Sequence, residues 1–588
     1  MRLNATRLGS IASSRSFGDQ LDDLAGQVPS LDLNFAQNKS LIDDYSGTTL
    51  VTHTRASSGT YVGSDGVLRT AVTNLSLRSQ ELGDAAWTKA LSSITADAAI
   101  APNGTTTADK LVEDSSTGVH SIVEAAAITY TNGLTYTFSF FVKKAERQTV
   151  QILMHPNPFP GNFNQRRAFF NSNTGAFVSV GSAYTGSSVT AFSDGWYRVS
   201  VSSTSDATAT GNFAIALCSD DIGTTSYTGD GTSGIYLWGA QLEQSATVGE
   251  YIPTTSTINS APRFDHDPTT GESLGLLVEE SRTNLLLQSE DFSTSWTTVT
   301  ATVTTNVATA PNGTTTADLY SGTSTSAVNQ SVSLTSGVTY TISFYVKSAG
   351  LGNDSFRLRI DGAQTSSNFT ATSEWQRFTF TATSANTGAR TCGIVRNTAG
   401  DNVDVLLWGA QLEAGAFPTS YIPTVAATVT RAADVASITG SNFSSWYRQD
   451  EGTVFVNGIT PPNRADFPSL NTLHDGTSNN RLLQYVFTSG YFSAARVGSV
   501  PQGDNTAAVT PTDGSAYKVA SAFAVNNSVT AVNGVTGSVD TLCLMPTALN
   551  TLAIGAEWNN ANIVNSTIRR LTYWPVRLSN EVLQRITQ

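Results

Sequence analysis

The sequence predicts an all-β chain of several β-sandwich (jelly-roll) modules, with short helices at the termini. Runs in which β-branched and aromatic residues alternate recur along the chain, as in Thr135–Val142 and Thr339–Val346. Such alternation, interrupted by Gly and Asn-Gly turn signals, is typical of sandwiches. Helical signals are few, and the clearest is Ser579, which precedes helix formers over 580–584. A length of 588 residues is enough for about three or four such domains.

Two parts of the chain repeat the same motifs in the same order. Ala101–Asp109 recurs letter for letter as Ala310–Asp318, and each copy later carries Leu-Trp-Gly-Ala-Gln-Leu-Glu, at 237–243 and 407–413. Each copy begins at a Thr-Asn-Leu and closes on a Tyr-Ile-Pro-Thr. So many shared motifs in one order predict a tandem duplication of one sandwich.

The first copy is longer than the second, mainly because of extra residues between 150 and 190. They include the Pro-, Asn- and aromatic-rich stretch Met154–Phe163, which is absent from the second copy. Loops carry variation while the sandwich stays fixed, so this insertion is expected to mark a difference in ligand. The predicted organisation is an N-terminal virion-attachment region with a β-hairpin (1–72), copy one (73–256, with the insertion 150–190), a connecting β-hairpin (257–282), copy two (283–425) and a different C-terminal sandwich (426–588).

Charge and cysteine content argue against several classes of function. Lys and Arg number 33 against 46 Asp and Glu, which gives a net charge of −13. Nucleic-acid binding needs clustered cations, so we expect no nucleic-acid partner. No run of about 18 apolar residues occurs, so we expect no membrane insertion. The three cysteines lie far apart, which argues against a disulfide framework and against a thiolate metal site.

The C-terminal part of the chain, about 435–588, resembles the concanavalin A-like (laminin G-type) jelly roll. The resemblance rests on the Val-Asn-Gly hairpin at 532–534, the Ile-Gly strand at 554–555 and the closing strand before a short helix. Other segments, together with the Trp-Gly-Ala-Gln-Leu-Glu motifs, resemble tailed-phage virion proteins of the fibre, spike or decoration type, which carry carbohydrate-binding-module-like jelly rolls. These segments are Arg55–Val62, Arg263–Pro268 and Gly275–Leu286.

The resemblance implies a non-catalytic virion protein, of the fibre or spike type, that binds host cell-surface polysaccharide for adsorption. It also implies contact with other virion proteins through the N-terminal region, a place on the particle surface after assembly in the host cytoplasm, and a trimer by analogy with fibres. A purely structural head or tail decoration or connector protein is the alternative. A polysaccharide-degrading spike enzyme is a second alternative.

Motifs for catalysis are missing from the sequence. It has no Gly-x-Ser-x-Gly elbow, no His-Glu-x-x-His and no phosphate-binding loop. Asp265, His266 and Asp267 are adjacent, but alternation along a strand sends neighbouring side chains to opposite faces. A glycosidase needs only two carboxylates, which keeps the enzymatic alternative open. We nevertheless predict no enzymatic activity.

Aromatic residues are candidates for stacking on sugar rings. Six tryptophans occupy repeated positions in the two copies, and we favour core packing for them because such residues dominate sandwich cores. They are Trp87, Trp196, Trp238, Trp296, Trp375 and Trp408. Aromatic residues outside the repeated motifs are the better candidates for carbohydrate contact: Phe159, Phe163, Tyr184, Trp446, Tyr447 and Tyr491.

A structural calcium ion is the one cofactor that the resemblance implies. Carbohydrate-binding jelly rolls commonly hold it between acidic residues near the first and last strands. Several carboxylates and carbonyls would have to converge on the ion. Acids in comparable places are Glu81 and Glu243 in copy one, and Glu290, Asp291 and Glu413 in copy two. Alternatively, these acids cap turns or pair with arginines such as Arg282.

Overall fold

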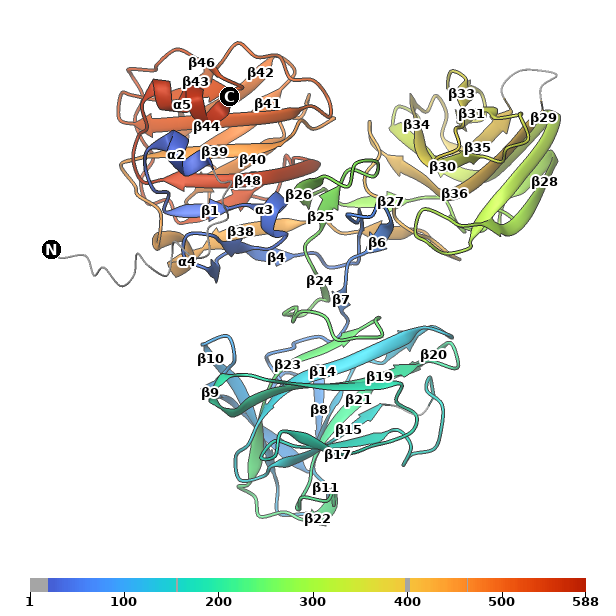
Figure 1. Cartoon of the computed structure of the whole chain (residues 1–588), viewed down its shortest axis with the longest axis vertical. Coiled ribbons are helices and arrows are strands. Elements are labelled where there is room, and N and C mark those ends of the chain that lie inside the picture. The colour runs from blue at the N-terminus through green and yellow to red at the C-terminus, as the bar shows by residue number, and fades with distance from the viewer. Residues whose placement is uncertain (1–19, 155–156, 397–401, 463) are drawn as a thin grey trace. The chain divides into compact units, whose positions relative to one another are not determined.

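The computed structural model describes residues 20–154, 157–396, 402–462 and 464–588. About half of these residues are in strands and very few are in helices, which confirms the all-β prediction (Figure 1). No helix among them is long and apolar enough to cross a membrane. The helices are α2 (Gln20–Ala25), α3 (Phe35–Asn38), α4 (Gly440–Ser444), α5 (Asn580–Thr587) and a 3₁₀ turn at Ser193–Gly195.

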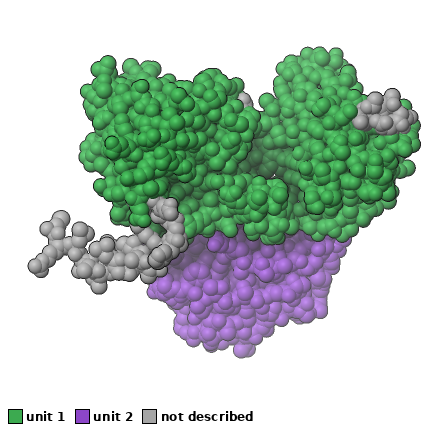
Figure 2. Space-filling model, turned by 45° about the horizontal axis from the view of Figure 1, so that its top comes forward, with its two compact units in different colours: residues 1–54, 59–70, 262–588 green, residues 55–58, 71–261 purple. Residues whose placement is uncertain are grey.

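The chain divides into two units, which Figure 2 shows in different colours. One unit contains the described residues up to Thr54, together with Gly59–Thr70 and Pro262–Gln588. The other contains Arg55–Ser58 and Ala71–Ala261, and thus copy one. Copy one therefore interrupts the chain of the first unit between two hairpin segments.

Copy one is a sandwich of two six-stranded antiparallel sheets. Phe138, Phe140 and Ile152 are among the buried residues that fill the space between them. The first sheet has the order β18 (Gly186–Ala191), β19 (Trp196–Thr204), β14 (Thr135–Lys143), β23 (Gly234–Glu243), β10 (Thr106–Glu113) and β9 (Ser92–Ile100). The second has the order β17 (Ala176–Val180), β16 (Arg167–Asn171), β15 (Thr149–Met154), β21 (Phe213–Leu217), β12 (Ser121–Glu124) and β8 (Trp87–Ala90).

Copy two forms a single nine-stranded sheet that folds over a core of its own. Its β29 (Ala317–Leu334) is 18 residues long and pairs with one neighbour through its first half and with another through its second half. The order is β32 (Gln364–Thr365), β31 (Ser355–Ile360), β35 (Gly388–Arg396), β29, β36 (Val403–Ala414), β30 (Thr339–Ser348) and β34 (Gln376–Thr383), with β28 (Thr297–Ala308) on β29 and β33 (Phe369–Thr370) on β31.

The C-terminal sandwich pairs an eight-stranded with a seven-stranded sheet. The first has the order β25 (Phe264–His266), β26 (Ser273–Val278), β48 (Ser566–Trp574), β39 (Glu451–Ile459), β44 (Ala516–Ala524), β45 (Val529–Val532) and β46 (Val535–Thr536), with β1 (Leu31–Leu33) on β48. The second has the order β4 (Thr52–Thr54), β38 (Val435–Thr439), β47 (Thr551–Ile554), β40 (Ser469–His474), β41 (Arg481–Phe487), β42 (Gly490–Val497) and β43 (Val500–Thr506).

Six two-stranded ribbons complete the described strands. Two of them, β7–β24 and β27–β37, stand at the beginning and the end of copy one and copy two. The ribbons are β2 (Ile42–Asp43) with β3 (Thr48–Thr49), β5 (Thr60–Val62) with β6 (Leu68–Thr70), β7 (Thr73–Asn74) with β24 (Asn259–Ser260), β11 (Thr117–Val119) with β22 (Ser226–Thr228), β13 (Ile128–Tyr130) with β20 (Ala209–Gly211), and β27 (Arg282–Asn284) with β37 (Val429–Arg431).

Strands from before copy one belong to the C-terminal sandwich. β1 pairs with β48 and β4 pairs with β38, and the connecting hairpin β25–β26 joins the same sheet as β1. Leu31, Leu33 and Phe35 are fully buried in the core of this sandwich, and Asp32 accepts two hydrogen bonds from Arg570 at 2.8 and 2.7 Å. The boundaries thus differ from a separate region 1–72, because these apolar residues complete a distant core. The part of the predicted attachment region before residue 20 lies outside the described residues.

The two copies close with the same buried hydrogen bonds. In copy one, Asn74 Nδ2 donates to the carbonyls of Ala240 at 3.0 Å and Ile252 at 2.8 Å, and its Oδ1 accepts from the Leu242 N–H at 3.1 Å. Asn284 makes the equivalent bonds in copy two, at 3.0, 2.9 and 3.1 Å. We call these six bonds the closing hydrogen bonds. They connect the Thr-Asn-Leu, Trp-Gly-Ala-Gln-Leu-Glu and Tyr-Ile-Pro-Thr motifs, which explains why both copies carry all three.

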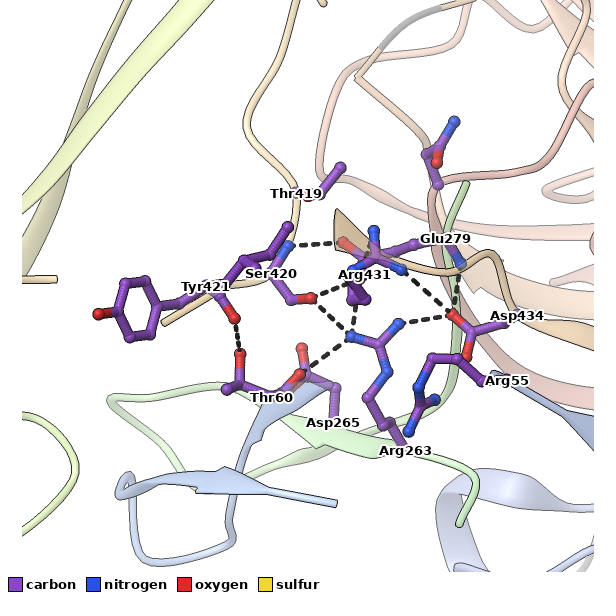
Figure 3. A network of polar contacts seen from close by, with 12 residues as sticks. Arg55, Thr60, Arg263, Asp265, Glu279, Thr419, Ser420, Tyr421, Arg431 and Asp434 are labelled. Carbon is purple, nitrogen blue, oxygen red and sulfur yellow. Dashed lines mark hydrogen bonds and ion pairs between the residues drawn. The ribbon is translucent and has the colours of Figure 1, made fainter. Parts of the chain in front are cut away.

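A buried cluster of two arginines and two acids lies where copy two meets the C-terminal sandwich (Figure 3). Arg263 Nη1 is 2.7 Å from Glu279 Oε2, and its Nη2 is 2.5 Å from Asp434 Oδ2. Glu279 also accepts from the backbone N–H and the hydroxyl of Ser420, at 2.7 and 2.6 Å. Burial raises the pKa of Glu279, but Arg431 and Arg263 outweigh burial and bring it to about 2. The ionised cluster therefore connects the closing segment of copy two to the hairpin and to the last sandwich.

Candidate functional site

The two sheets of copy one differ in what covers their outer faces. On the sheet that contains β14 and β23, Phe141, Trp238 and Tyr251 pack together, with ring centroids 4.7–5.8 Å apart. Tyr251 comes from the closing segment, and burial raises its pKa to about 12. On the other sheet, the outward positions of β16 are Arg167 and Phe169, and both are partly exposed. We call this second surface the open face of copy one.

The insertion reaches the open face through a loop that is anchored in the core. Phe159 is only 2% exposed, and its ring packs against those of Tyr130 and Tyr136. Buried Arg166 donates to the Gly161 carbonyl at 2.6 Å, and the Tyr184 hydroxyl donates to the Arg166 carbonyl at 2.6 Å. These contacts fix both ends of the loop. The next aromatic side chain in the loop, Phe163, is therefore presented to solvent and is 53% exposed.

Arg167 lies between two aromatic rings on the open face. Its guanidinium carbon is 5.0 Å from the ring centroid of Phe163 and 4.8 Å from that of Phe169. Its Nε donates to Gln151 Oε1 at 2.9 Å and its Nη2 to Thr225 Oγ1 at 3.2 Å. Within the described part of the chain, it forms no ion pair with a carboxylate. The cation is thus held by rings and neutral groups, and it keeps its charge available to a ligand.

A short turn after β21 borders the same face. Asp220 accepts hydrogen bonds from the backbone N–H groups of Ile222, Gly223 and Thr224 at 2.8–3.2 Å. Gly223 has φ near +101°, and a side chain there would collide with the Phe169 ring at 2.6 Å. Glycine is therefore needed for the turn to lie against this ring. Ile222, at the tip of the turn, is 78% exposed.

These groups form a surface suited to a flat ligand that carries hydroxyl groups. Partly exposed rings can pack against the C–H face of a sugar ring, and the guanidinium can donate to its hydroxyls. Asn164 and Thr225 add an exposed amide and a half-exposed hydroxyl beside the guanidinium. The arrangement provides stacking and hydrogen bonding, which is chemistry for binding.

Of the six aromatic residues predicted to contact carbohydrate, Phe163 is the exposed one in copy one, while Phe159 and Tyr184 support its loop. The other three belong to the C-terminal sandwich. Trp446 and Tyr491 are 5% and 2% exposed in its core. Tyr447 is partly buried against Phe443, at 4.7 Å between ring centroids. Since their rings pack on other side chains, we do not include these three in the site.

The repeated tryptophans lie mainly in the interior. Five are at most 8% exposed, whereas the sixth, Trp375, is partly exposed. Trp375 donates through Nε1 to the Thr309 carbonyl at 3.0 Å, as Trp196 does to the Ile100 carbonyl at the same distance. The five buried residues are Trp87, Trp196, Trp238, Trp296 and Trp408.

The acids predicted to hold calcium in copy one have protein partners. Glu81 is exposed and pairs with Arg78 at 2.6 Å. Glu243 is fully buried and accepts from the Gln241 side chain and the Gly249 N–H, both at 2.9 Å. The two carboxylates thus serve a surface ion pair and a buried turn.

The acids predicted to hold calcium in copy two are also used locally. Glu290 accepts from the Tyr421 hydroxyl at 3.1 Å, Asp291 accepts from the Ser293 N–H at 2.9 Å, and Glu413 accepts from the Thr419 N–H at 3.0 Å. Arg282, the suggested alternative partner, pairs with Glu280. No group of three or more His, Cys, Asp or Glu side chains in the described ranges could hold a metal ion. Calcium binding stays a prediction.

Phe163 is a predicted contact residue that lies at this candidate site, whereas Arg167 and Phe169 were not predicted from the sequence. The available signal was the stretch Arg166-Arg167-Ala168-Phe169-Phe170. In a strand, successive side chains of this stretch point to opposite faces of the sheet. Period-two alternation places Arg167 and Phe169 on one face and Ala168 and Phe170 on the other. Only the pairing of β16 with β15 shows which of these faces is buried.

No protein-family model matches the chain, and no curated protein sequence matches it. Among solved structures, the IT-sialidase CBM40 of Ruminococcus gnavus is 15% identical, with 24% of this chain and 84% of that one covered and a TM-score of 0.21. The CBM22-1–CBM22-2 tandem of Xyn10C from Paenibacillus barcinonensis is 12% identical, with 59% and 98% covered and a TM-score of 0.22. The LG1-3 region of the laminin alpha2 chain is 10% identical, with 79% and 97% covered and a TM-score of 0.18. TM-scores this low carry no argument about the function of this chain.

Proposed function

We propose that the protein is a non-catalytic glycan-binding protein and that the open face of copy one holds the sugar. The observation that carries the proposal is Arg167 between the rings of Phe163 and Phe169 with no carboxylate partner among the described residues. Aromatic rings on both sides of a guanidinium offer a sugar ring stacking surfaces and hydrogen-bond donors at one place. The buried anchors of the loop support the proposal, because they hold these groups in place before a ligand arrives.

We further propose that the protein belongs to a tailed-phage particle and contributes to adsorption on host cell-surface polysaccharide. The support is the sequence resemblance of the chain to virion proteins. A single site of this kind binds weakly, and several linked copies of the chain on one particle would raise the overall affinity without new contacts. Contact with other virion proteins, a trimeric assembly and a position on the virion surface are parts of the same proposal.

The proposal is tested by Phe163→Ala in the full chain, with surface polysaccharide extracted from candidate hosts as the probe. We expect binding in biolayer interferometry to weaken at least about tenfold, which corresponds to about 1.4 kcal/mol. The matched control is Phe192→Ala, since Phe192 is 41% exposed in the same module but packs on Phe141 at the other sheet. Equal loss of binding in both variants, or none in either, would contradict the proposal.

The same preparation separates the two alternative functions. A purely structural decoration or connector protein would bind none of the host polysaccharides yet would still be incorporated into particles. A depolymerase would release reducing ends from the polysaccharide during incubation. Binding without reducing ends is the result we expect.

A further inference from the structure

The sheet that carries the open face has a counterpart in copy two. In copy one, Ile152 of β15 pairs with Ile215 of β21. In copy two, Leu358 of β31 pairs with Ile394 of β35. All four side chains are fully buried in the core of their own copy. β31 and β35 therefore stand where β15 and β21 stand, and residues of the two copies can be compared position by position.

The outward positions beside these core residues differ in chemistry. In copy one they are Gln151 and Leu153, which are neutral. In copy two they are Arg357 and Arg359, which are two residues apart on one strand and therefore point to the same side. Both arginines are partly exposed. We call the surface around them the arginine face of copy two.

The two arginines have few partners of their own. Arg359 Nη2 donates to Asn329 Oδ1 at 2.6 Å, and its buried Nε has no acceptor. Arg357 makes only long contacts of 3.4 Å, from Nε to the Arg396 carbonyl and from Nη1 to Thr365 Oγ1. Neither guanidinium forms an ion pair with any carboxylate in the described residues. Burial lowers the pKa of Arg359, and the neighbouring Arg357 charge lowers it further.

Among the other arginines of copy two, Arg390 has a nearby acid and Arg377 has short hydrogen bonds, whereas Arg357 has only contacts of 3.4 Å. Arg390 Nε lies 3.2 Å from Asp361 Oδ1. Arg377 donates to the Thr419 carbonyl at 2.6 Å and to Ser343 Oγ at 3.0 and 3.2 Å. The chain holds 46 acidic residues against 33 basic ones, so acids for pairing are plentiful. Two adjacent cations without one are electrostatically unfavourable until an anion arrives.

We propose that the arginine face of copy two binds the carboxylate or sulfate groups of an acidic polysaccharide. A guanidinium presents parallel N–H donors that match two oxygens of such a group. The Cα atoms of alternate residues on a strand are about 7 Å apart, so these two long side chains can contact one anion together or two successive anions of a polymer. The inference goes beyond the site in copy one and depends on the proposed function only in placing the anion on a polysaccharide.

A polysaccharide fits this face better than a nucleic acid does. Nucleic-acid affinity grows with the number of phosphates that a protein neutralises, and two arginines neutralise few. The net charge of −13 repels a dense polyanion at long range. Acidic polysaccharides carry their charges further apart and add hydroxyls for partly exposed neutral groups such as Thr365. Binding to DNA is therefore an outcome that the test must include.

The test uses the full chain and immobilised polymers: polygalacturonate for carboxylate, dextran sulfate for sulfate, dextran as the neutral polymer and double-stranded DNA. The double variant Arg357→Gln with Arg359→Leu gives copy two the residue types that copy one has at the corresponding positions, Gln151 and Leu153. We expect it to lose at least about tenfold in affinity for whichever acidic polymer binds. The control Arg390→Gln, which removes a charge from the inward side of the same sheet, should keep that affinity within about twofold.

Three results would overturn the inference: no binding of either acidic polymer by the natural chain, equal binding of DNA, or equal loss in the Arg390→Gln control. A lysine pair, Arg357→Lys with Arg359→Lys, sharpens the test, because it keeps the charge but removes the parallel donors. Retained affinity in the lysine pair would show simple charge attraction and would also count against the inference. Phe163→Ala should leave acidic-polymer binding unchanged, so failure of this site and failure of the site in copy one are separate results.

Discussion

The two copies agree where their chains close and differ where their outer faces are open. The closing hydrogen bonds of Asn74 measure 3.0, 2.8 and 3.1 Å, and those of Asn284 measure 3.0, 2.9 and 3.1 Å. Gln151, on the sheet that carries the open face of copy one, corresponds to Arg357 on the arginine face of copy two. A duplicated sandwich thus keeps the polar groups that fix its fold. Outward strand positions can change independently of the closing segments, because they take no part in the closing hydrogen bonds.

The largest effect is expected when the closing hydrogen bonds are removed. Asn74→Ala should lower the free energy of unfolding of copy one by about 3 kcal/mol, because two carbonyls and two N–H groups lose a buried partner. Asn284→Ala should do the same to copy two. Hydrogen exchange resolved by peptide is the measurement, and each variant should affect its own copy. Exchange that rises equally in both copies would contradict the proposal that each copy is closed by its own asparagine.

A smaller, pH-dependent effect on stability is expected at a position where copy one carries an acid, Glu124, and copy two carries an amide, Gln330. Glu124 accepts from Ser76 Oγ at 2.7 Å and from the Leu77 N–H at 3.1 Å, and burial raises its pKa to about 7. Gln330 of copy two accepts from the Leu287 N–H at 2.8 Å. Because the folded pKa of Glu124 lies above the unfolded value, copy one loses stability as pH rises from about 4.5 to 7.

Glu124→Gln should therefore stabilise copy one by about 2–3 kcal/mol at pH 8 and have little effect at pH 4. The reciprocal variant Gln330→Glu should destabilise copy two at pH 8. Thermal unfolding at both pH values checks the pair. A stability gain at pH 4 as large as that at pH 8 would mean that burial of the ionised carboxylate is not the cause.

The smallest effect is expected at a tryptophan pair that differs in exposure. Trp196→Phe removes the indole N–H and part of the volume of a side chain that is only 1% exposed, at a cost of about 2 kcal/mol. Trp375→Phe frees the Thr309 carbonyl at a partly exposed place that water can reach, at a cost of about 1 kcal/mol. Denaturant unfolding of the two variants should show this order, and a reversed order would contradict the burial argument.

Much of the fold was predictable from the sequence, because the residues that fix it are polar residues of a kind that strands rarely contain. Asn74 and Asn284 sit in repeated motifs, and repetition alone predicted the duplication. The open face was harder to predict, since Arg167 and Phe169 become site residues only through the pairing of β16 with β15. The same limit applies to Phe159, whose neighbours in sequence look like those of Phe163, although its ring fills the core.

The connection between the start and the end of the chain was not predictable from local patterns. Trp574 Nε1 donates to the Gln27 carbonyl at 3.0 Å, across 547 positions of sequence. Nothing in either segment indicates the other, because a short apolar run such as Leu31–Leu33 can pair with many strands. Long-range partners of this kind need the tertiary structure.

That connection has a consequence for biosynthesis. A ribosome releases β1 and β4 long before it has made β48, so these early strands have no partner while both sandwich copies emerge and fold. The C-terminal sandwich can be completed only after synthesis of nearly the whole chain. A shortened product that lacks β48 would carry intact sandwich copies beside unpaired apolar strands. Such unpaired strands are a feature by which cellular quality control can recognise an incomplete product.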